Sequence, residues 1–169
     1  MGLFNSSKCL VPISSYFYLA LPFYILIYLN KYYLDGKIII FWLLSIVWAS
    51  DSSAFIFGSI IKGKKFFPSI SPNKTWSGFI FSLLFSVISS SIFSYYFNFI
   101  NIYQAMLGGL VIGLFTAFGD LFESYLKRIN NKKDSSKLIP GHGGILDRLD
   151  GFLFAIVVMF IFILLWSNR

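Results

Sequence analysis

The sequence predicts an all-α protein, a polytopic bundle of about five transmembrane helices. Of its 169 residues, 57% are hydrophobic and only 12% are charged, whereas soluble domains contain about 25% charged residues. Apolar runs of the roughly 20 residues needed to cross a bilayer recur along the chain. No internal repeat or linker interrupts the chain, so we expect one membrane-embedded domain over residues 1–169.

Five segments have, or nearly have, the length and apolarity of a membrane span. The predicted spans are residues 11–29, the segment between Lys37 and Lys62, and residues 76–97, 103–122 and 145–166. Eleven of the fourteen basic residues then fall before span one, between spans two and three, or between spans four and five. Basic residues favour the cytoplasmic side, so we expect these three regions in the cytoplasm. The same bias accounts for the net charge of +7 without nucleic acid as a partner.

Charge is concentrated in residues 120–150. This segment holds five of the seven acidic residues, six of the fourteen basic residues and the only histidine. Because charge inside or beside a membrane is costly, such a concentration indicates a functional site. Carboxylates mixed with Lys and Arg around a Gly-Gly pair suggest metal ions that hold a phosphate-rich ligand.

Four polar residues at the end of span four have the spacing of one helical face. These are Asp120, Glu123, Ser124 and Lys127. A helix leaving the membrane explains Lys127 and the next residue, Arg128, because cations are favoured at a helix C-terminus. It does not explain the two acids, which would oppose the helix dipole there, so we favour a polar cavity.

A glycine-rich turn precedes span five and contains His142, Gly143 and Gly144. Such a turn at the start of a helix presents backbone N–H groups to an anion. Asp147 and Asp150 follow at i and i+3, with Arg148 between them. Acids in a first helical turn are also expected structurally, but that does not explain the arginine. A lone histidine is usually a loop residue, and we do not assign it as a metal ligand.

Three further features lie outside residues 120–150. Asp51 falls inside span two, where a charge indicates a functional site, although pairing with a lysine of another helix is the structural alternative. Residues 69–76, with Ser71 and Lys74, have the composition of a loop followed by an interfacial tryptophan. The Gly109–Gly113 pair is more typical of a helix-packing face than of a site.

These residues resemble the phosphatidate cytidylyltransferase (CDP-diglyceride synthase) family. From Ser124 to Asp150 the chain fits every fixed position of the family signature S-x-φ-K-R-x4-K-D-x-small-x2-φ-P/G-x-H-G-G-φ-x-D-R-φ-D, where φ is apolar. Residues 48–54 resemble its W-A-x-D-x-x-A run. Residues 71–78 resemble its S-P-K-K-T-W-E-G motif, with Asn73 and Ser77 in place of the usual Lys and Glu.

The resemblance implies a nucleotidyltransferase that transfers CMP from CTP to phosphatidic acid within the membrane. It implies that Asp120, Asp147 and Asp150 hold Mg²⁺, with a second metal ion as an option, and that Lys127, Arg128 and Arg148 face phosphates. The remaining candidates for substrate binding are Asp51, Ser71, Lys74, Glu123, Ser124, Lys133, Asp134, His142, Gly143 and Gly144. CTP and phosphatidic acid are both anions, so cations must screen their charges when they meet. Mg²⁺ held by one or two carboxylates and by substrate oxygens would provide this screening.

Family members usually carry more N-terminal membrane helices than this chain. We expect this short form to be active, and a homodimer is one arrangement that would allow it. The competing hypothesis is an inactive remnant. Two different activities also compete: another CTP-dependent lipid transferase or lipid kinase, and an ion-coupled transporter, which the absence of a repeat disfavours. We expect the protein in a bacterial inner membrane with its site on the cytoplasmic side.

Overall fold

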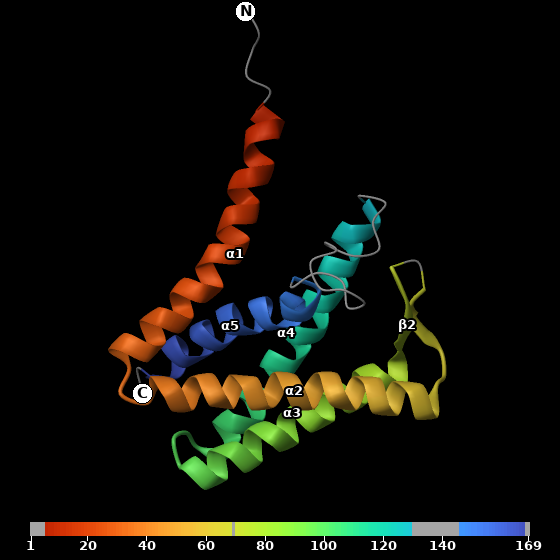
Figure 1. The fold of residues 1–169 in the computed structure, drawn as a ribbon. Helices are drawn as coiled ribbons and strands as arrows, with labels where there is room; N and C mark the ends of the chain where they lie inside the picture. Colours follow the sequence, from red (N-terminus) through yellow and green to blue (C-terminus); the bar gives the residue numbers. More distant parts are fainter. Residues whose placement is uncertain (1–5, 69, 130–145, 168–169) are drawn as a thin grey trace, which may run out of the picture.

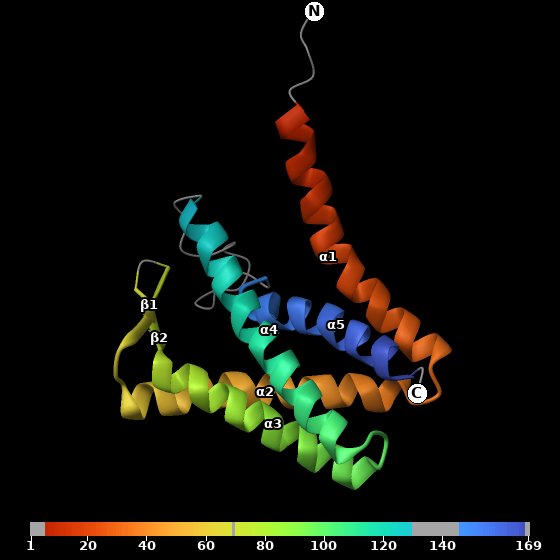
Figure 2. The same ribbon diagram turned by 180° about the vertical axis from the view of Figure 1, so that it is seen from behind.

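The computed structural model describes residues 6–68, 70–129 and 146–167, and the side chains of residues 18–68, 70–129 and 149–166 (Figures 1 and 2). The described elements are five helices and one short antiparallel hairpin. They are α1 (Ser6–Tyr32), α2 (Gly36–Ile61), β1 (Lys65–Phe67), β2 (Ser71–Thr75), α3 (Trp76–Phe97), α4 (Ile102–Ile129) and α5 (Leu146–Ser167). This confirms the predicted all-α class.

Among the described residues, α2, α3, α4 and α5 are long and apolar enough to cross a membrane. They coincide with the second to fifth predicted spans, and α1 covers the first one. A run of apolar residues favours a helix in lipid because only a helix satisfies every backbone N–H and C=O within the segment. The chain is therefore an integral membrane protein.

The core lies where α2, α4, α5 and the C-terminal half of α1 pack together, with α3 on the outer side of α2 and α4 (Figures 1 and 2). Trp42 of α2, Ile112 of α4 and Met159 of α5 are fully buried there. The indole Nε1 of Trp42 donates a hydrogen bond of 2.9 Å to Ser90 Oγ of α3. This bond satisfies a buried donor that would otherwise be costly in the bundle interior.

A small-residue face joins α3 to α4. Ser82, Ser86, Ser90 and Ser94 are all buried and recur every four residues along α3. A Cβ added to Gly109 would lie 2.7 Å from the Ser90 Cβ, and one added to Gly113 would collide with Ser86 Oγ. The predicted packing role of the glycine pair is confirmed, since these helix backbones approach too closely for larger side chains.

The bundle has two distinct ends. One, the hairpin end, contains the C-terminus of α2, both strands, the N-terminus of α3 and the C-terminus of α4 (Figure 1). The other, the turn end, contains the α1–α2 turn, the α3–α4 turn and the C-terminus of α5 (Figure 2). The described lysines of the 62–75 connection and the basic residues of α4 share the hairpin end, as the predicted topology requires.

Two boundaries differ from the sequence prediction. The 62–75 connection, predicted as a loop, contains a hairpin in which Lys65 pairs with Thr75 and Phe67 pairs with Ser71. Helix α4 continues past the predicted end at residue 122 to Ile129. Its last turn carries Lys127 and Arg128, which stabilise a helix C-terminus even outside the bilayer.

The longer α4 corrects one argument from the sequence. Asp120 lies nine residues before the end of α4, more than two turns inside the helix. Repulsion by the C-terminal dipole, which falls off within the last turn, is therefore not the reason that Asp120 is unusual. The reason is its position among packed, apolar membrane helices.

Candidate active site

A cavity of about 810 Å³ opens at the hairpin end. Its described lining comes from α2, the hairpin, α3 and α4, and includes four residues predicted from the sequence. They are Asp51, Ser71, Lys74 and Asp120. Asp51, which the sequence places inside span two, thus lines a cavity, and three segments far apart in sequence contribute to the same space.

The side chains of Lys74 and Asp120 form an ion pair across this cavity. Lys74 Nζ, at the end of the hairpin, donates to Asp120 Oδ2 of α4 at 3.1 Å. The two side chains are 32% and 26% exposed, so both remain accessible from the cavity. An accessible lysine held at a carboxylate is well placed to transfer its hydrogen bonds to an incoming phosphate.

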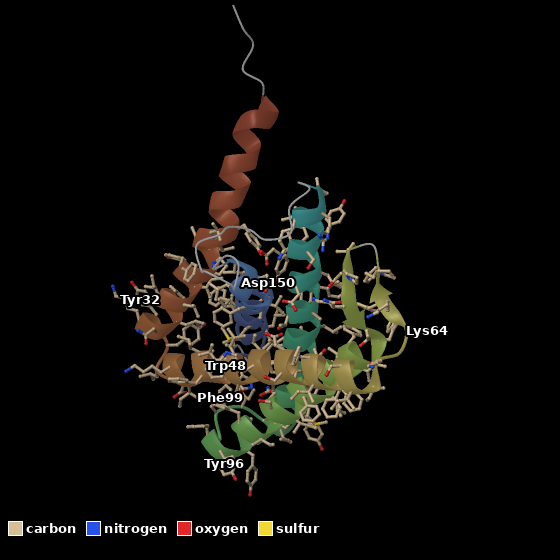
Figure 3. All side chains as sticks on the ribbon, turned by 45° about the vertical axis from the view of Figure 1, so that its right-hand side comes forward. Tyr32, Trp48, Lys64, Tyr96, Phe99 and Asp150 are labelled. Carbon is tan, nitrogen blue, oxygen red and sulfur yellow. The ribbon has the colours of Figure 1, made fainter. Side chains whose placement is uncertain are left out.

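Helices α4 and α5 cross at two glycines beside this ion pair. A Cβ on Gly119 would lie 2.9 Å from the Asp150 carbonyl oxygen, and one on Gly151 would lie 2.5 Å from Asp120 Oδ1. Asp120 and Asp150 consequently lie next to each other at the crossing. Figure 3 shows Asp150 where α5 meets α4. The crossing of α4 and α5 therefore brings these two acids together.

Sequence reasoning missed both crossing glycines. Their signal was nevertheless present, because Gly119 directly precedes Asp120 and Gly151 directly follows Asp150. A glycine beside an intramembrane acid on each of two helices indicates a close crossing that presents the acids to each other.

The remaining predicted residues of α4 lie beyond the cavity lining. Lys127 Nζ lies 3.6 Å from Glu123 Oε1, one turn apart on the predicted face, and Glu123 is buried. Ser124 is half-buried on the same helix. Arg128 Nε donates to the Ile70 carbonyl oxygen at 3.2 Å, so this arginine joins the end of α4 to the hairpin turn.

Several predicted residues lie outside the described part of the chain. These are Lys133, Asp134, His142, Gly143 and Gly144. Asp147 and Arg148 belong to the first turn of α5, but their side chains are outside the described set.

The acids of this region suit a hard cation. Among the described side chains, no group of three or more His, Cys, Asp or Glu residues is arranged to hold a metal ion. Asp120 and Asp150 nevertheless offer two adjacent carboxyl groups, and only oxygen ligands, which Mg²⁺ prefers. Two carboxylates so close repel each other unless a cation or a proton lies between them. The donor chemistry therefore fits Mg²⁺.

A third residue that sequence reasoning missed, besides the two glycines, is Lys62, the C-cap of α2. Lys62 lines the cavity, and its backbone has φ 57° and ψ −121°. A non-glycine residue in such a conformation costs of order 1–3 kcal/mol. The sequence signal is weak, because Lys62-Gly63 reads as an ordinary helix stop.

Comparison with known proteins agrees with this geometry. Residues 4–166 match the model of a family described as the cytidylyltransferase family. This chain belongs to the cytidylyltransferase family. The match includes α2 to α4, which line the cavity, and nearly all of α5, which carries Asp150.

Curated members of the cytidylyltransferase family support the assignment. A phosphatidate cytidylyltransferase of Staphylococcus haemolyticus is 40% identical over 126 residues, which are 74% of this chain and 48% of that protein. Another of Helicobacter pylori is 41% identical over 136 residues, which are 79% of this chain and 51% of that protein. The chain thus spans about half the length of these relatives.

Proposed function

We propose that this chain transfers CMP from CTP to phosphatidic acid, forming CDP-diacylglycerol and pyrophosphate. The observation that carries the proposal is the hairpin-end cavity, where Asp51, Lys74 and Asp120 meet inside an apolar bundle. Relatives that are named phosphatidate cytidylyltransferases and match about three quarters of this chain support it further.

In this reaction an oxygen of the lipid phosphate attacks the α-phosphorus of CTP. The bond from that phosphorus to the β-phosphate oxygen breaks, and pyrophosphate leaves with its electron pair. No covalent bond to the protein is needed, so the chain must bind, align and screen two anions. Lys74 screens phosphate charge when it leaves Asp120, and the half-buried cavity excludes part of the bulk water that would compete as nucleophile.

Asp120 and Asp150 would hold Mg²⁺, with Asp147 as a further ligand predicted from the sequence. The ion supplies screening of the phosphate oxygens and stabilisation of charge on the leaving group. Positive-inside bias supports a cytoplasmic location for the hairpin end, because its basic residues outnumber those of the turn end. CTP is available on that side.

The test is pyrophosphate release by the purified chain in mixed micelles. We expect release only when CTP, phosphatidic acid and Mg²⁺ are all present, together with CDP-diacylglycerol as the lipid product. Release of CDP with a lipid alcohol as acceptor would identify a lipid kinase instead. No product from either acceptor, with the protein folded, would refute both activities.

A further inference from the structure

The backbone at Lys62 adopts a conformation that suits glycine better than lysine. Its φ of 57° lies in the left-handed region, and Gly63 follows with φ 91°. Glycine at position 62 would adopt these angles without a steric penalty, and asparagine would also tolerate a positive φ. A lysine at a strained position inside a cavity wall suggests that its side chain has a use there.

The neighbouring helix holds this conformation in place. Ser77 Oγ donates a hydrogen bond of 2.6 Å to the Lys62 carbonyl oxygen. Ser77 Oγ also lies 3.1 Å from Thr75 Oγ1, which caps α3 by accepting from the Gly78 N–H. The end of α2 is thus tied to the start of α3, and the Lys62 side chain projects from a supported backbone.

Two lysines of the cavity wall have no counter-ion in the described part of the chain. Lys74 pairs with Asp120, whereas no described carboxylate lies within ion-pairing distance of Lys62 or Lys65. Both residues line the cavity, and both are exposed. They are therefore available to an anionic ligand that enters from the hairpin side.

An apolar wall continues from these lysines along α2. Phe55 lines the same cavity, is 78% exposed, and lies on α2 about two turns before the C-cap of that helix, Lys62. Phe66 and Phe79 line the cavity near the hairpin. Cations at the end of a membrane helix followed by exposed rings along it match an anionic lipid, whose phosphate lies at the interface and whose chains extend into the bilayer.

We propose that Lys62, assisted by Lys65, binds the phosphomonoester of the lipid substrate and sets specificity for it. This assignment rests on the proposed function and deepens it by dividing the site. The lipid phosphate lies against the hairpin wall, and the nucleotide phosphates lie toward Asp120 and Asp150, where α4 meets α5.

Substitutions at position 62 separate the effect of the ammonium charge from the effect of the positive φ. Lys62→Asn and Lys62→Gly remove the ammonium group but suit the positive φ, so the melting temperature should be unchanged or higher. Lys62→Arg keeps the charge at the same backbone cost. Lys64→Asn is the matched control, because Lys64 does not line the cavity and lies at the outer edge of the hairpin (Figure 3).

The kinetic readout is the KM for dioleoyl phosphatidate in mixed micelles. We expect it to rise about tenfold in Lys62→Asn and Lys62→Gly, as for loss of one charge-assisted hydrogen bond. The KM for CTP should stay constant, and Lys62→Arg and Lys64→Asn should resemble the wild type. An unchanged KM for the lipid in Lys62→Asn would overturn the proposal, and so would a rise in the KM for CTP alone.

Binding without turnover is measured by native mass spectrometry. The wild-type chain and Lys64→Asn should retain dioleoyl phosphatidate in preference to dioleoyl phosphatidylcholine, and Lys62→Asn should lose that preference. Equal retention by all three variants would refute the lipid site. Retention that depends on Lys62, in a chain that releases no pyrophosphate, would refute the proposed activity and leave the lipid site standing.

Discussion

The two ends of the bundle each contain a cavity, but the cavities differ in chemistry. The hairpin-end cavity, about 810 Å³, contains both signs of charge, with lysines of α2 and the hairpin opposite Asp51 and Asp120. The turn-end cavity, about 520 Å³, is lined mainly by aromatic and aliphatic side chains, with Asp35 as its one described charged residue. Residues of α2 and α4 line both cavities, whereas α3 and the hairpin line only the first, and α1 and α5 only the second.

The aromatic residues of the turn end have a structural explanation. Phe99 packs edge-on against Trp42 at 5.3 Å between ring centroids, and Phe162 stacks on Trp166 at 4.6 Å. Aromatic side chains are common where membrane helices reach the interface. Charges facing one another inside the bundle have no such general explanation, because their burial is costly. The charges, more than the cavity volumes, therefore mark the hairpin end as the candidate site and the turn end as structural.

The largest expected difference between the ends is their exposure to opposite sides of the membrane. With Cys9 replaced by serine, Tyr96→Cys at the turn end should react with an impermeant thiol reagent in intact cells. Lys64→Cys at the hairpin end should react only after the cells are permeabilised. Tyr96 is 75% exposed, and both positions lie at the surface in Figure 3. Labelling in the reverse order would invert the topology.

The second difference concerns turnover. Asp120→Asn keeps the side-chain shape but removes the partner of Lys74 and one proposed ligand of Mg²⁺. Turnover should fall about 10²-fold, as for loss of electrostatic stabilisation of a transition state. Asp35→Asn, at the turn end, should leave turnover unchanged. Normal rates of pyrophosphate release by Asp120→Asn would remove that carboxylate from the site.

A third comparison uses one glycine at each end. In Gly151→Ala the new Cβ would lie 2.5 Å from Asp120 Oδ1, and in Gly36→Ala it would collide with the Leu29 carbonyl oxygen. Both variants should lose about 1–3 kcal/mol of stability from overpacking. Only Gly151→Ala should also lose turnover per folded molecule, measured well below its melting temperature. Equal turnover in both would mean that the α4–α5 crossing does not position Asp120.

The smallest effect is expected from a hydrogen bond that packs the turn end of the bundle. Ser90→Ala removes the acceptor of the Trp42 indole and should destabilise the bundle by about 1 kcal/mol, with no change in turnover. Trp42→Phe removes the donor instead. If the Trp42–Ser90 hydrogen bond accounts for the stability lost in Ser90→Ala, the two substitutions should not be additive. Thermal melting should then show that the double variant loses less stability than the two single variants added together.

Much of this architecture could be predicted from the sequence. Apolar run lengths predicted the helices because a bilayer imposes a minimum span and leaves the backbone no other way to satisfy its polar groups. Basic residues on alternate connections predicted that the 62–75 region and the end of α4 share one end. The rarity of charge in membrane segments marked Asp51 and Asp120 as site residues, and the structure brings both to one cavity.

Other features were decided only by the tertiary structure. The pairing of Lys74 with Asp120, 46 residues later, and the strained backbone of Lys62 depend on how helix ends meet in space. Helical periodicity shows which residues share a face, but does not show which face of another helix lies opposite. Gly119 and Gly151 illustrate the limit: each allows a close approach, but the approach that joins Asp120 to Asp150 exists only once α4 and α5 cross. The sequence by itself determined the membrane spans and the residues that carry charge, because both follow from the cost of transfer into lipid. Packing between helices determined which of those charges act together.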